Sequence, residues 1–238
     1  MARAGSTEVV LIDGVGGRQV TFRPKRLILG GYTGRDQKQV RIHIDELTAQ
    51  GIPAPEQVPE LYPGLPDKIQ IGGRLPSGKG WSSGEVEYVL FETSEGVYVG
   101  VGSDHTDRYV QRSSVVAAKQ AFPKIVGERI WPMDYLISEW DSLTLKSTLI
   151  YRGERRHHQE ASVATIIPPT ELLALAREHG QSDGLVVFSG TVPTVSPAPK
   201  HGRCRFLGEL IGPDGEALSS CNYEYEAGAV PDGEHRDV

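Results

Sequence analysis

The sequence predicts a mixed, β-rich α+β fold with about three short helices. Short apolar or alternating stretches recur along the chain, whereas patterns with helical spacing are few. Glycine and proline number 28 and 16, which implies many turns. The 238 residues are 38% hydrophobic and 24% charged, enough for one large domain or two small ones. Because no internal repeat or clean linker is visible, we expect a single domain over residues 1–238.

The first half of the chain is expected to hold several strands and two helices. EVVLIDGVGGRQVTF, residues 8–22, shows two apolar stretches around a glycine-rich turn, which is typical of a hairpin. GVGGRQ superficially matches a dinucleotide-binding fingerprint, but a strand rather than a helix follows, so that interpretation fails. The remaining expected elements are a strand at 26–31, a helix from Asp36 to Ala49, a long ordered loop at 52–80, strands at 84–91 and 96–101, and a helix from about Thr106 to Lys119.

The second half continues the β-rich pattern. PTELLALAREH at 169–179 predicts a helix because proline stands at an early position, where its missing N–H costs nothing. The polar tail at 228–238 is expected to be loose. The other expected elements are strands near 143–151 and 161–167, a buried strand run at 182–194, and a hairpin of 205–212 with 217–227.

Composition narrows the class of protein. The net charge of −6 and the lack of a basic face argue against a nucleic-acid partner. The densest basic run, at 152–159, contains a glutamate and is expected to be a solvated loop. No apolar run reaches membrane-spanning length and no signal peptide is visible, so we expect a soluble cytoplasmic protein. Cys204 and Cys221 are interpreted as ordinary thiols.

Two glutamates on one predicted strand are the first candidate site. Glu85 and Glu87 share a face because successive side chains of a strand alternate. Two like charges on one face repel unless solvent screens them or a cation lies between them. Asp104 follows the next strand, and three carboxylates supply the oxygen ligands that Mg²⁺, Mn²⁺ or Ca²⁺ prefer. A solvated face without any metal is the alternative.

Three further residues are candidates on weaker grounds. His43 and Glu46 are three positions apart on the first predicted helix, so they would be neighbours on its surface. The alternative is an ordinary surface pair. Lys119 lies in the apolar context VVAAKQAF, which would bury it in part, although a lysine at a helix end can also extend to water.

Five segments of the chain form a recognisable series, in the order GYTGRDQKQVRIHIDEL, GEVEYVLF, VGVGSDHTDRYVQ, AAKQAFP and VVFSGTVPTV. This series resembles the fumarylacetoacetate hydrolase superfamily. The superfamily shows a Gly-Leu-Asn-Tyr-like stretch running into H-x-x-E, then E-x-E, an Asn-Asp-Val-Ser-Ala-Arg-Asp-like turn, a lysine, and a strand ending in Thr-Gly-Thr-Pro-x-Gly. The similarity spans roughly residues 28–212 and implies a fumarylacetoacetate-hydrolase-like β-roll, a metal-dependent enzyme and a homodimer.

By this resemblance, Glu85, Glu87 and Asp104 are the ligands of a divalent metal, Mg²⁺ or else Mn²⁺ or Ca²⁺. Lys119 becomes the lysine that steadies substrate oxygens. His43 with Glu46 becomes a pair that handles water and protons, carried on a lid over residues 36–66.

The resemblance also assigns substrate contacts. Ser189, Gly190 and Thr191 form the turn that contacts substrate, and Gln159 matches a family glutamine in a more weakly similar segment. The chain departs from the family pattern in a shorter segment between the E-x-E and the aspartate, in the turn SDHTDR, and in QAFPKIVG after the lysine.

The expected function is metal-dependent hydrolysis of a C–C or similar acyl bond in a small keto or dicarbonyl acid. A metal there can polarise a carbonyl, and a lysine can offset charge on an enolate or oxyanion. A decarboxylase or keto–enol isomerase of a related acid is the first alternative. A metal-binding module without catalysis is the second.

Overall fold

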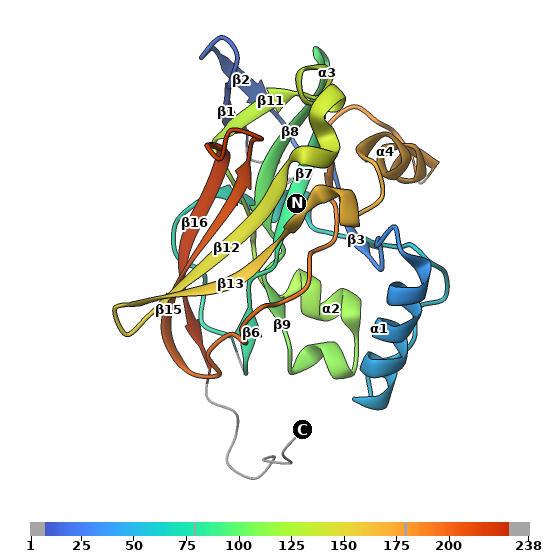
Figure 1. The fold of residues 1–238 in the computed structure, drawn as a ribbon, viewed down its shortest axis with the longest axis vertical. Helices are drawn as coiled ribbons and strands as arrows, with labels where there is room; N and C mark the ends of the chain where they lie inside the picture. The colour runs from blue at the N-terminus through green and yellow to red at the C-terminus, as the bar shows by residue number, and fades with distance from the viewer. Residues whose placement is uncertain (1–7, 79, 179, 229–238) are drawn as a thin grey trace, which may run out of the picture.

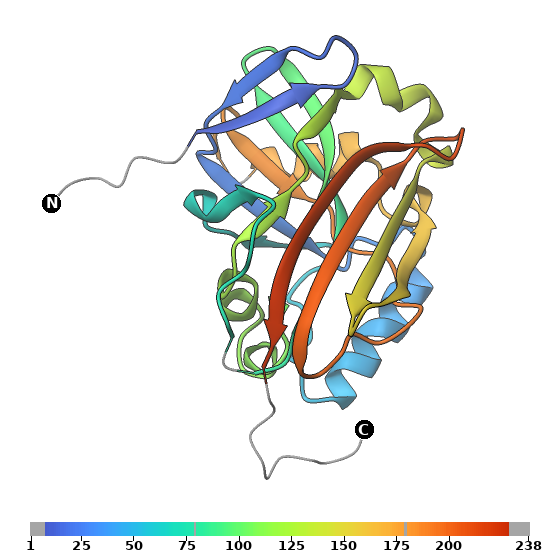
Figure 2. The same cartoon turned by 90° about the vertical axis from the view of Figure 1, so that its left-hand side faces the viewer.

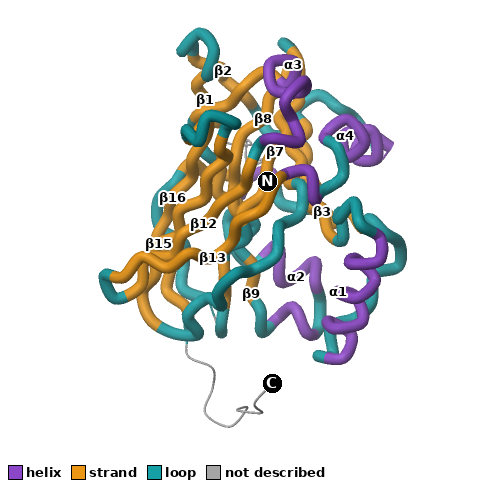
Figure 3. The backbone as a smooth tube through the Cα atoms, viewed as in Figure 1, coloured by secondary structure: helices purple, strands orange, loops and turns teal. Residues whose placement is uncertain are grey.

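Two β-sheets pack face to face, and the helices lie at their margins (Figures 1 and 3). The computed structural model describes residues 8–78, 80–178 and 180–228. Within these ranges a ten-stranded, a four-stranded and a two-stranded sheet are present. The β-rich α+β prediction is therefore confirmed. The loose tail predicted at 228–238 lies outside the described residues from residue 229 onward.

The larger sheet runs in the order β2-β1-β11-β8-β7-β14-β3-β4, and β10 joins it by pairing with both β8 and β5. Its strands are β1 (Val9–Asp13), β2 (Gln19–Phe22), β3 (Arg26–Gly31), β4 (Glu60–Pro63), β5 (Ile69–Ile71), β7 (Val86–Thr93), β8 (Gly96–Ser103), β10 (Lys124–Val126), β11 (Arg129–Pro132) and β14 (Leu185–Phe188).

The four-stranded sheet runs in the order β13-β12-β15-β16 and presents long antiparallel strands in Figure 2. Its strands are β12 (Thr144–Tyr151), β13 (Glu154–Ser162), β15 (Gly202–Ile211) and β16 (Ala217–Ala227). A two-stranded sheet consists of β6 (Ser82–Ser83) and β9 (Thr106–Asp107).

The helices of the described residues are short. The α-helices are α1 (Gln37–Ala49), α2 (Val115–Gln120), α3 (Met133–Leu136) and α4 (Pro169–Glu178). The 3-10 helices are η1 (Pro66–Lys68), η2 (Val110–Arg112), η3 (Ile137–Ser142) and η4 (Val163–Thr165). In α1, Asp36 accepts hydrogen bonds from the first-turn amides and so fixes the start of the helix.

Strand β7 is buried on both faces. Val86 and Tyr88 belong to the core shared with the four-stranded sheet, whereas Val89 and Phe91 belong to a second core inside the larger sheet. The predicted alternation along this strand is thus confirmed. Glu87 shares the face of Val89 and Phe91 and is fully buried. A solvated face is therefore excluded for this carboxylate.

Most other expected elements are present at or near their predicted positions. They are the hairpin of β1 and β2, the strand β3, the helices α1 and α4, the strands β8 and β12, the buried strand β14, and the final hairpin of β15 and β16.

The helix predicted from Thr106 to Lys119 is wrong over most of its length. Thr106 and Asp107 form β9 instead, and Asp107 accepts hydrogen bonds from the amides of Tyr109 and Val110, which starts a 3-10 turn. Ser114 then caps α2. Because the side chains of Asp107 and Ser114 accept hydrogen bonds from nearby amides, two short helical segments form where one longer helix was predicted.

Two further predictions needed correction. The loop predicted at 52–80 contains the short strands β4 and β5, which pair with β3 and β10 and contribute few residues each. The strand predicted near 161–167 is the end of β13 followed by η4, because Ser162 accepts a hydrogen bond from the amide of Ala164 and turns the chain.

Candidate metal centre

The pairing of β7 with β8 brings three acidic side chains together. Glu85 immediately precedes β7, Glu87 lies within it, and Asp104 immediately follows β8. Val86 pairs with Ser103, and the amide of Asp104 donates to the carbonyl of Glu85 at 3.1 Å. One carboxylate oxygen from each of the three acids lies within 4.8 Å of the others. These are the three residues that the sequence nominated as metal ligands.

Glu87 carries an oxygen that lacks a partner. Its Oε2 accepts a hydrogen bond from the amide of Gly190 at 2.8 Å. Its Oε1 is buried and has no hydrogen-bond partner among the described residues. Burial raises the pKa of Glu87 well above its usual value, and the negative charge of Asp104 adds to the effect. A divalent cation would satisfy this oxygen, so the acidic group fits such an ion.

Two lysines pair with Asp104. Lys119 contacts Oδ2, and Nζ of Lys124 lies 2.6 Å from Oδ1 without the angles of a hydrogen bond. All three side chains are buried. Burial opposes ionisation of Asp104, but the two ammonium groups outweigh it and lower its pKa to about 2. Burial also lowers the pKa of Lys124, whereas for Lys119 the surrounding carboxylates overcome burial and raise the pKa.

Arg108 completes the charged group. Its guanidinium donates to Glu85 Oε1 at 2.8 Å and to Ser83 Oγ at 2.8 Å. Three carboxylates therefore face three cationic side chains, and the formal charge of these six groups is zero. A carboxylate offers about four lone-pair positions, so pairing with a cation leaves sites for a metal.

The turn predicted to contact substrate lies beside Glu87. Gly190 has φ of +82°, and a Cβ at this position would overlap Oγ1 of Thr33. Oγ1 of Thr33 donates to the carbonyl of Ser189 at 2.6 Å, and Oγ1 of Thr191 donates to the carbonyl of Val86 at 2.8 Å. The turn is held tightly against the first residue of β7.

Gln159 acts on this turn from β13. Its amide nitrogen donates to Thr191 Oγ1 and to the carbonyl of Val192, each at 2.8 Å. Its Oε1 accepts from the amide of Val86 at 3.0 Å and from Ser147 Oγ at 3.1 Å. The side chain is buried and its bonding groups are engaged by the protein. In this structure Gln159 therefore supports the candidate site indirectly, by its hydrogen bond to Thr191.

The structure does not bring His43 and Glu46 to the carboxylates. Both are on α1 with side chains 60% and 65% exposed, and Nδ1 of His43 lies 3.9 Å from Glu46 Oε2. The imidazole ring lies 6.3 Å, between centroids, from the ring of Tyr32. In the described part of the chain, neither side chain hydrogen-bonds to the three acids or to Lys119.

Lys124 and Arg108 were missed by sequence reasoning. Lys124 stands in the buried strand β10, in the apolar run AFPKIV, and a lysine in such a run signals a buried charge that needs a partner. Arg108 gave no comparable signal, because its partners Glu85 and Ser83 come from a distant part of the chain.

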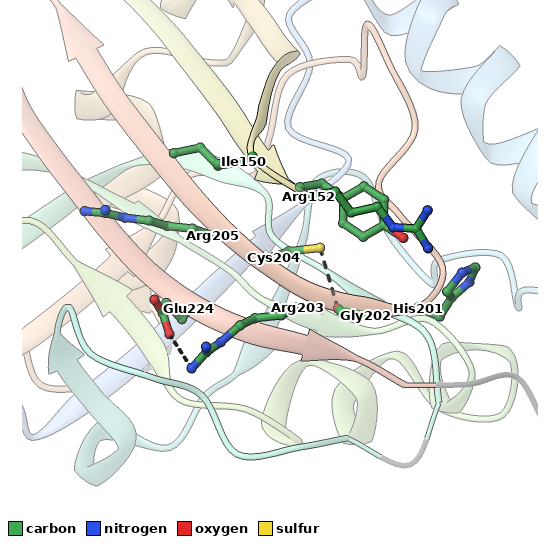
Figure 4. Close-up of a pocket in the computed structure, with 10 residues that line it drawn as sticks. Ile150, Arg152, His201, Gly202, Arg203, Cys204, Arg205 and Glu224 are labelled. Carbon is green, nitrogen blue, oxygen red and sulfur yellow. Dashed lines mark hydrogen bonds and ion pairs between the residues drawn. The ribbon is translucent and has the colours of Figure 1, made fainter.

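A separate pocket lies where β12 ends and β15 begins. Its volume is about 490 Å³, and it shares no residue with the acidic group (Figure 4). The residues lining it include Tyr151, Arg152, Arg203, Cys204 and Arg205. The thiol of Cys204 contacts the carbonyl of Gly202 at 3.7 Å, and burial raises its pKa, so it is not an activated nucleophile and the acidic group remains the candidate site.

None of the helices in the described ranges combines the length and the apolar character that crossing a membrane requires.

Solved structures with the same fold include enzymes of the superfamily named above. A candidate fumarylacetoacetate isomerase/hydrolase of Oleispira antarctica aligns with a TM-score of 0.66 at 20% identity, covering 94% of this chain and 100% of that chain. The fumarylpyruvate hydrolase of Pseudomonas aeruginosa, in complex with Mn²⁺ and pyruvate, gives 0.64 at 18%, covering 94% and 97%. A 2-keto-3-deoxy-D-arabinonate dehydratase gives 0.61 at 12%, covering 85% and 73%.

These likenesses confirm the predicted fumarylacetoacetate hydrolase fold. A search of curated proteins returned no match. The family model described as "Protein of unknown function (DUF2848)" matches residues 30–223. Since this match covers most of the 238 residues, the chain belongs to the DUF2848 family.

Proposed function

We propose that the protein is a divalent-metal-dependent hydrolase that cleaves a C–C or similar acyl bond in a small keto or dicarbonyl acid. The observation that carries this proposal is the convergence of three carboxylates, one with a buried partnerless oxygen, beside the buried Lys119. The fold supports it, since a protein of this fold is a fumarylpyruvate hydrolase in complex with Mn²⁺ and pyruvate. A homodimer, as the resemblance implies, is part of the proposal and is tested by sedimentation.

Glu85, Glu87 and Asp104 would hold the metal, which we propose to be Mg²⁺, or else Mn²⁺ or Ca²⁺, by the preference of such cations for carboxylate oxygens. When bound, it would supply Lewis-acid polarisation of a substrate carbonyl. The formal charge of the six charged groups is zero without it, so the loaded site is positive. An anionic carbonyl acid offsets that charge, which supports this substrate class.

Lys119 would stabilise negative charge on the reacting oxygens. Its ammonium is buried, with a side chain 8% exposed, and it stays protonated because the surrounding carboxylates raise its pKa. A charge fixed in a site of low dielectric acts more strongly than in water. The turn of Ser189, Gly190 and Thr191 would contact substrate.

His43 would accept a proton from the attacking water, with Glu46 orienting its ring. Since both are exposed, this role requires α1, the part of the lid segment 36–66 that precedes β4, to move toward the acidic group. The ring of Tyr32 lies 6.3 Å from that of His43, and the charge of Lys119 acts to lower the pKa of the Tyr32 hydroxyl.

A decarboxylase or keto–enol isomerase is the second candidate. The absence of any contact between His43 and the acids in the described structure favours it, since neither reaction needs an activated water. The shared fold of a sugar-acid dehydratase also shows that the scaffold is used by an enzyme named for a non-hydrolytic reaction.

Product analysis of the Mn²⁺-loaded protein with a panel of keto and dicarbonyl acids tests the proposal. Hydrolysis yields two organic fragments, decarboxylation yields carbon dioxide, and isomerisation yields neither. Glu87→Gln is the inactive reference, and Glu216→Gln, on an exposed turn, controls for the change of charge. Binding of Mn²⁺ without turnover of any acid would support a metal-binding module instead.

A further inference from the structure

Strand β4 carries a further carboxylate, outside the acidic group, on its Lys119 side. Nζ of Lys119 lies 5.7 Å from the centroid of the Tyr62 ring. The hydroxyl of Tyr62 donates to Oε2 of Glu60 at 2.8 Å. Residues 60 and 62 are on the same face of the strand, because side chains alternate along it. Glu60 therefore lies on the Lys119 side of β4, one tyrosine away from the buried lysine.

The place of this pair is fixed by the sheet. Glu60 pairs with Gly31 of β3, and Tyr62 pairs with Leu29. A Cβ at Gly31 would lie 2.7 Å from Cε2 of Tyr62, so the glycine leaves room for the ring. Because β4 is hydrogen-bonded along β3, Glu60 is held by backbone pairing and not only by its side-chain bond.

Tyr32 directly follows Gly31, the residue of β3 that pairs with Glu60. It is half-buried, and burial together with the charge of Glu60 raises the pKa of its hydroxyl, while Lys119 opposes the rise. The phenol therefore stays neutral and can act as a hydrogen-bond donor. Among the described residues Glu60 forms no ion pair, whereas Lys119 is already paired with Asp104. The carboxylate of Glu60 is therefore a hydrogen-bond acceptor whose negative charge has no ion-pair partner among the described residues.

We propose that Glu60 is a specificity-determining residue that selects substrates with a neutral hydrogen-bond donor, such as a hydroxyl, at the end remote from the keto acid group. This inference rests on the proposed function. A hydroxyl at that end would donate to the free positions of the Glu60 carboxylate. A second carboxylate would instead face a like charge in a partly buried site, which disfavours its binding.

Three acids of equal chain length provide the test. They are 2-oxopentanoate, which ends in a methyl group, 5-hydroxy-2-oxopentanoate, which ends in a hydroxyl, and 2-oxoglutarate, which ends in a carboxylate. Their affinities are measured by calorimetry on the full chain loaded with Mn²⁺. We expect the hydroxy acid to bind about tenfold more tightly than 2-oxopentanoate, and 2-oxoglutarate about tenfold more weakly.

Glu60→Gln removes the charge and keeps an acceptor for the Tyr62 hydroxyl, so the fold and Mn²⁺ binding should be preserved. In this variant the penalty against 2-oxoglutarate should disappear, with little change for 2-oxopentanoate. Glu56→Gln makes the same charge change at an exposed position of the preceding loop and should keep the wild-type order.

The outcomes separate the two proposals. If wild type binds Mn²⁺ and binds the three acids equally, or if Glu60→Gln leaves their order unchanged, the role of Glu60 is overturned while the proposed function stands. If wild type binds neither Mn²⁺ nor any of the acids, the proposed function fails, and the role of Glu60 fails with it.

Discussion

The amide of Gly190 donates to Oε2 of Glu87 at 2.8 Å, across 103 positions of the chain. This bond joins the turn after β14 to a fully buried carboxylate of the candidate metal centre. It satisfies Oε2 of Glu87, while Oε1 has no hydrogen-bond partner among the described residues. The backbone conformation of Gly190 therefore helps to orient the carboxylate of Glu87, a proposed metal ligand.

Gly190→Ala should destabilise the protein and weaken metal binding. The positive φ costs an alanine about 1 kcal/mol, and its Cβ would also overlap Thr33. We expect a loss of about 3 kcal/mol in the free energy of unfolding, measured with urea.

Gly153→Ala is the matched control, since Gly153 has φ of +83° but no atom within 4 Å of the added Cβ. It should lose about 1 kcal/mol and bind Mn²⁺ normally. Equal losses in the two variants would show that the contact with Thr33 is unimportant.

Glu87→Gln should separate stability from metal binding. Replacing a buried carboxyl group, whose ionisation is opposed by burial and whose Oε1 lacks a partner, by a neutral amide should raise the free energy of unfolding of the metal-free protein by about 1 kcal/mol. Mn²⁺ affinity should fall at least about 100-fold, because one of three anionic ligands is lost. Mn²⁺ should accordingly raise the melting temperature of wild type and of Glu216→Gln, but not that of Glu87→Gln. Unchanged Mn²⁺ affinity would remove Glu87 from the ligand set.

The acidic group could be predicted from sequence because it depends on local rules. Alternation along β7 places Glu85 and Glu87 on one side, and a hairpin partner must bring Asp104 back beside them. The order of motifs then supplied Lys119 through resemblance. Each of these signals is contained in a short stretch of residues.

The cationic partners of the acidic group and the position of Glu60 on β4 could not be predicted in the same way. Arg108 reaches Glu85 and Lys124 reaches Asp104 only after β8, β9 and β10 have packed. Glu60 stands in a strand whose short length conceals its period, and β4 is defined by its pairing with β3 rather than by its own pattern. Tertiary contacts, and not local propensity, decide these positions.

The stability of the fold should fall as the pH drops below about 6.5, in part through His158. Burial lowers the pKa of His158 in the folded protein, although its Nδ1 lies 2.6 Å from the carbonyl of Ser196. The unfolded chain therefore binds a proton that the folded chain resists. The contribution of His158 to the free energy of unfolding is complete above its pKa in the unfolded chain, about 6.5, and is lost as the pH falls toward its lower pKa in the folded protein.

Urea titrations between pH 5 and pH 8 measure this effect. One proton accounts for a slope of up to about 1.4 kcal/mol per pH unit. His158→Asn should be less stable at pH 8 and show a shallower slope than wild type. If both proteins show the same slope, other groups cause the acid sensitivity.

The segment 36–66 should gain protection from hydrogen exchange when a ligand binds. Only Val40 and Ile44 of α1 are buried, so the helix has few apolar anchors and belongs to the less stable part of the fold. Exchange is compared with and without Mg²⁺ plus oxalate. Helix α4, which buries Leu172, Leu173 and Ala176, should show no change. Equal exchange of α1 in both conditions would make this segment a fixed wall of the site.

His43→Ala should reduce turnover and leave metal binding intact. The imidazole lies outside the three-carboxylate group, so Mn²⁺ affinity should stay near that of wild type. Loss of a positioned acid–base group lowers kcat by about 10²–10⁴-fold. Glu46→Gln should lower kcat less, because glutamine can still accept the hydrogen bond that orients the ring.

His157→Ala is the matched control, since His157 is a surface histidine that pairs with Glu160 three positions away. Metal titration and kinetics on the same preparations decide the matter. Full activity of His43→Ala would reduce the α1 pair to a surface feature and favour the decarboxylase or isomerase over the hydrolase.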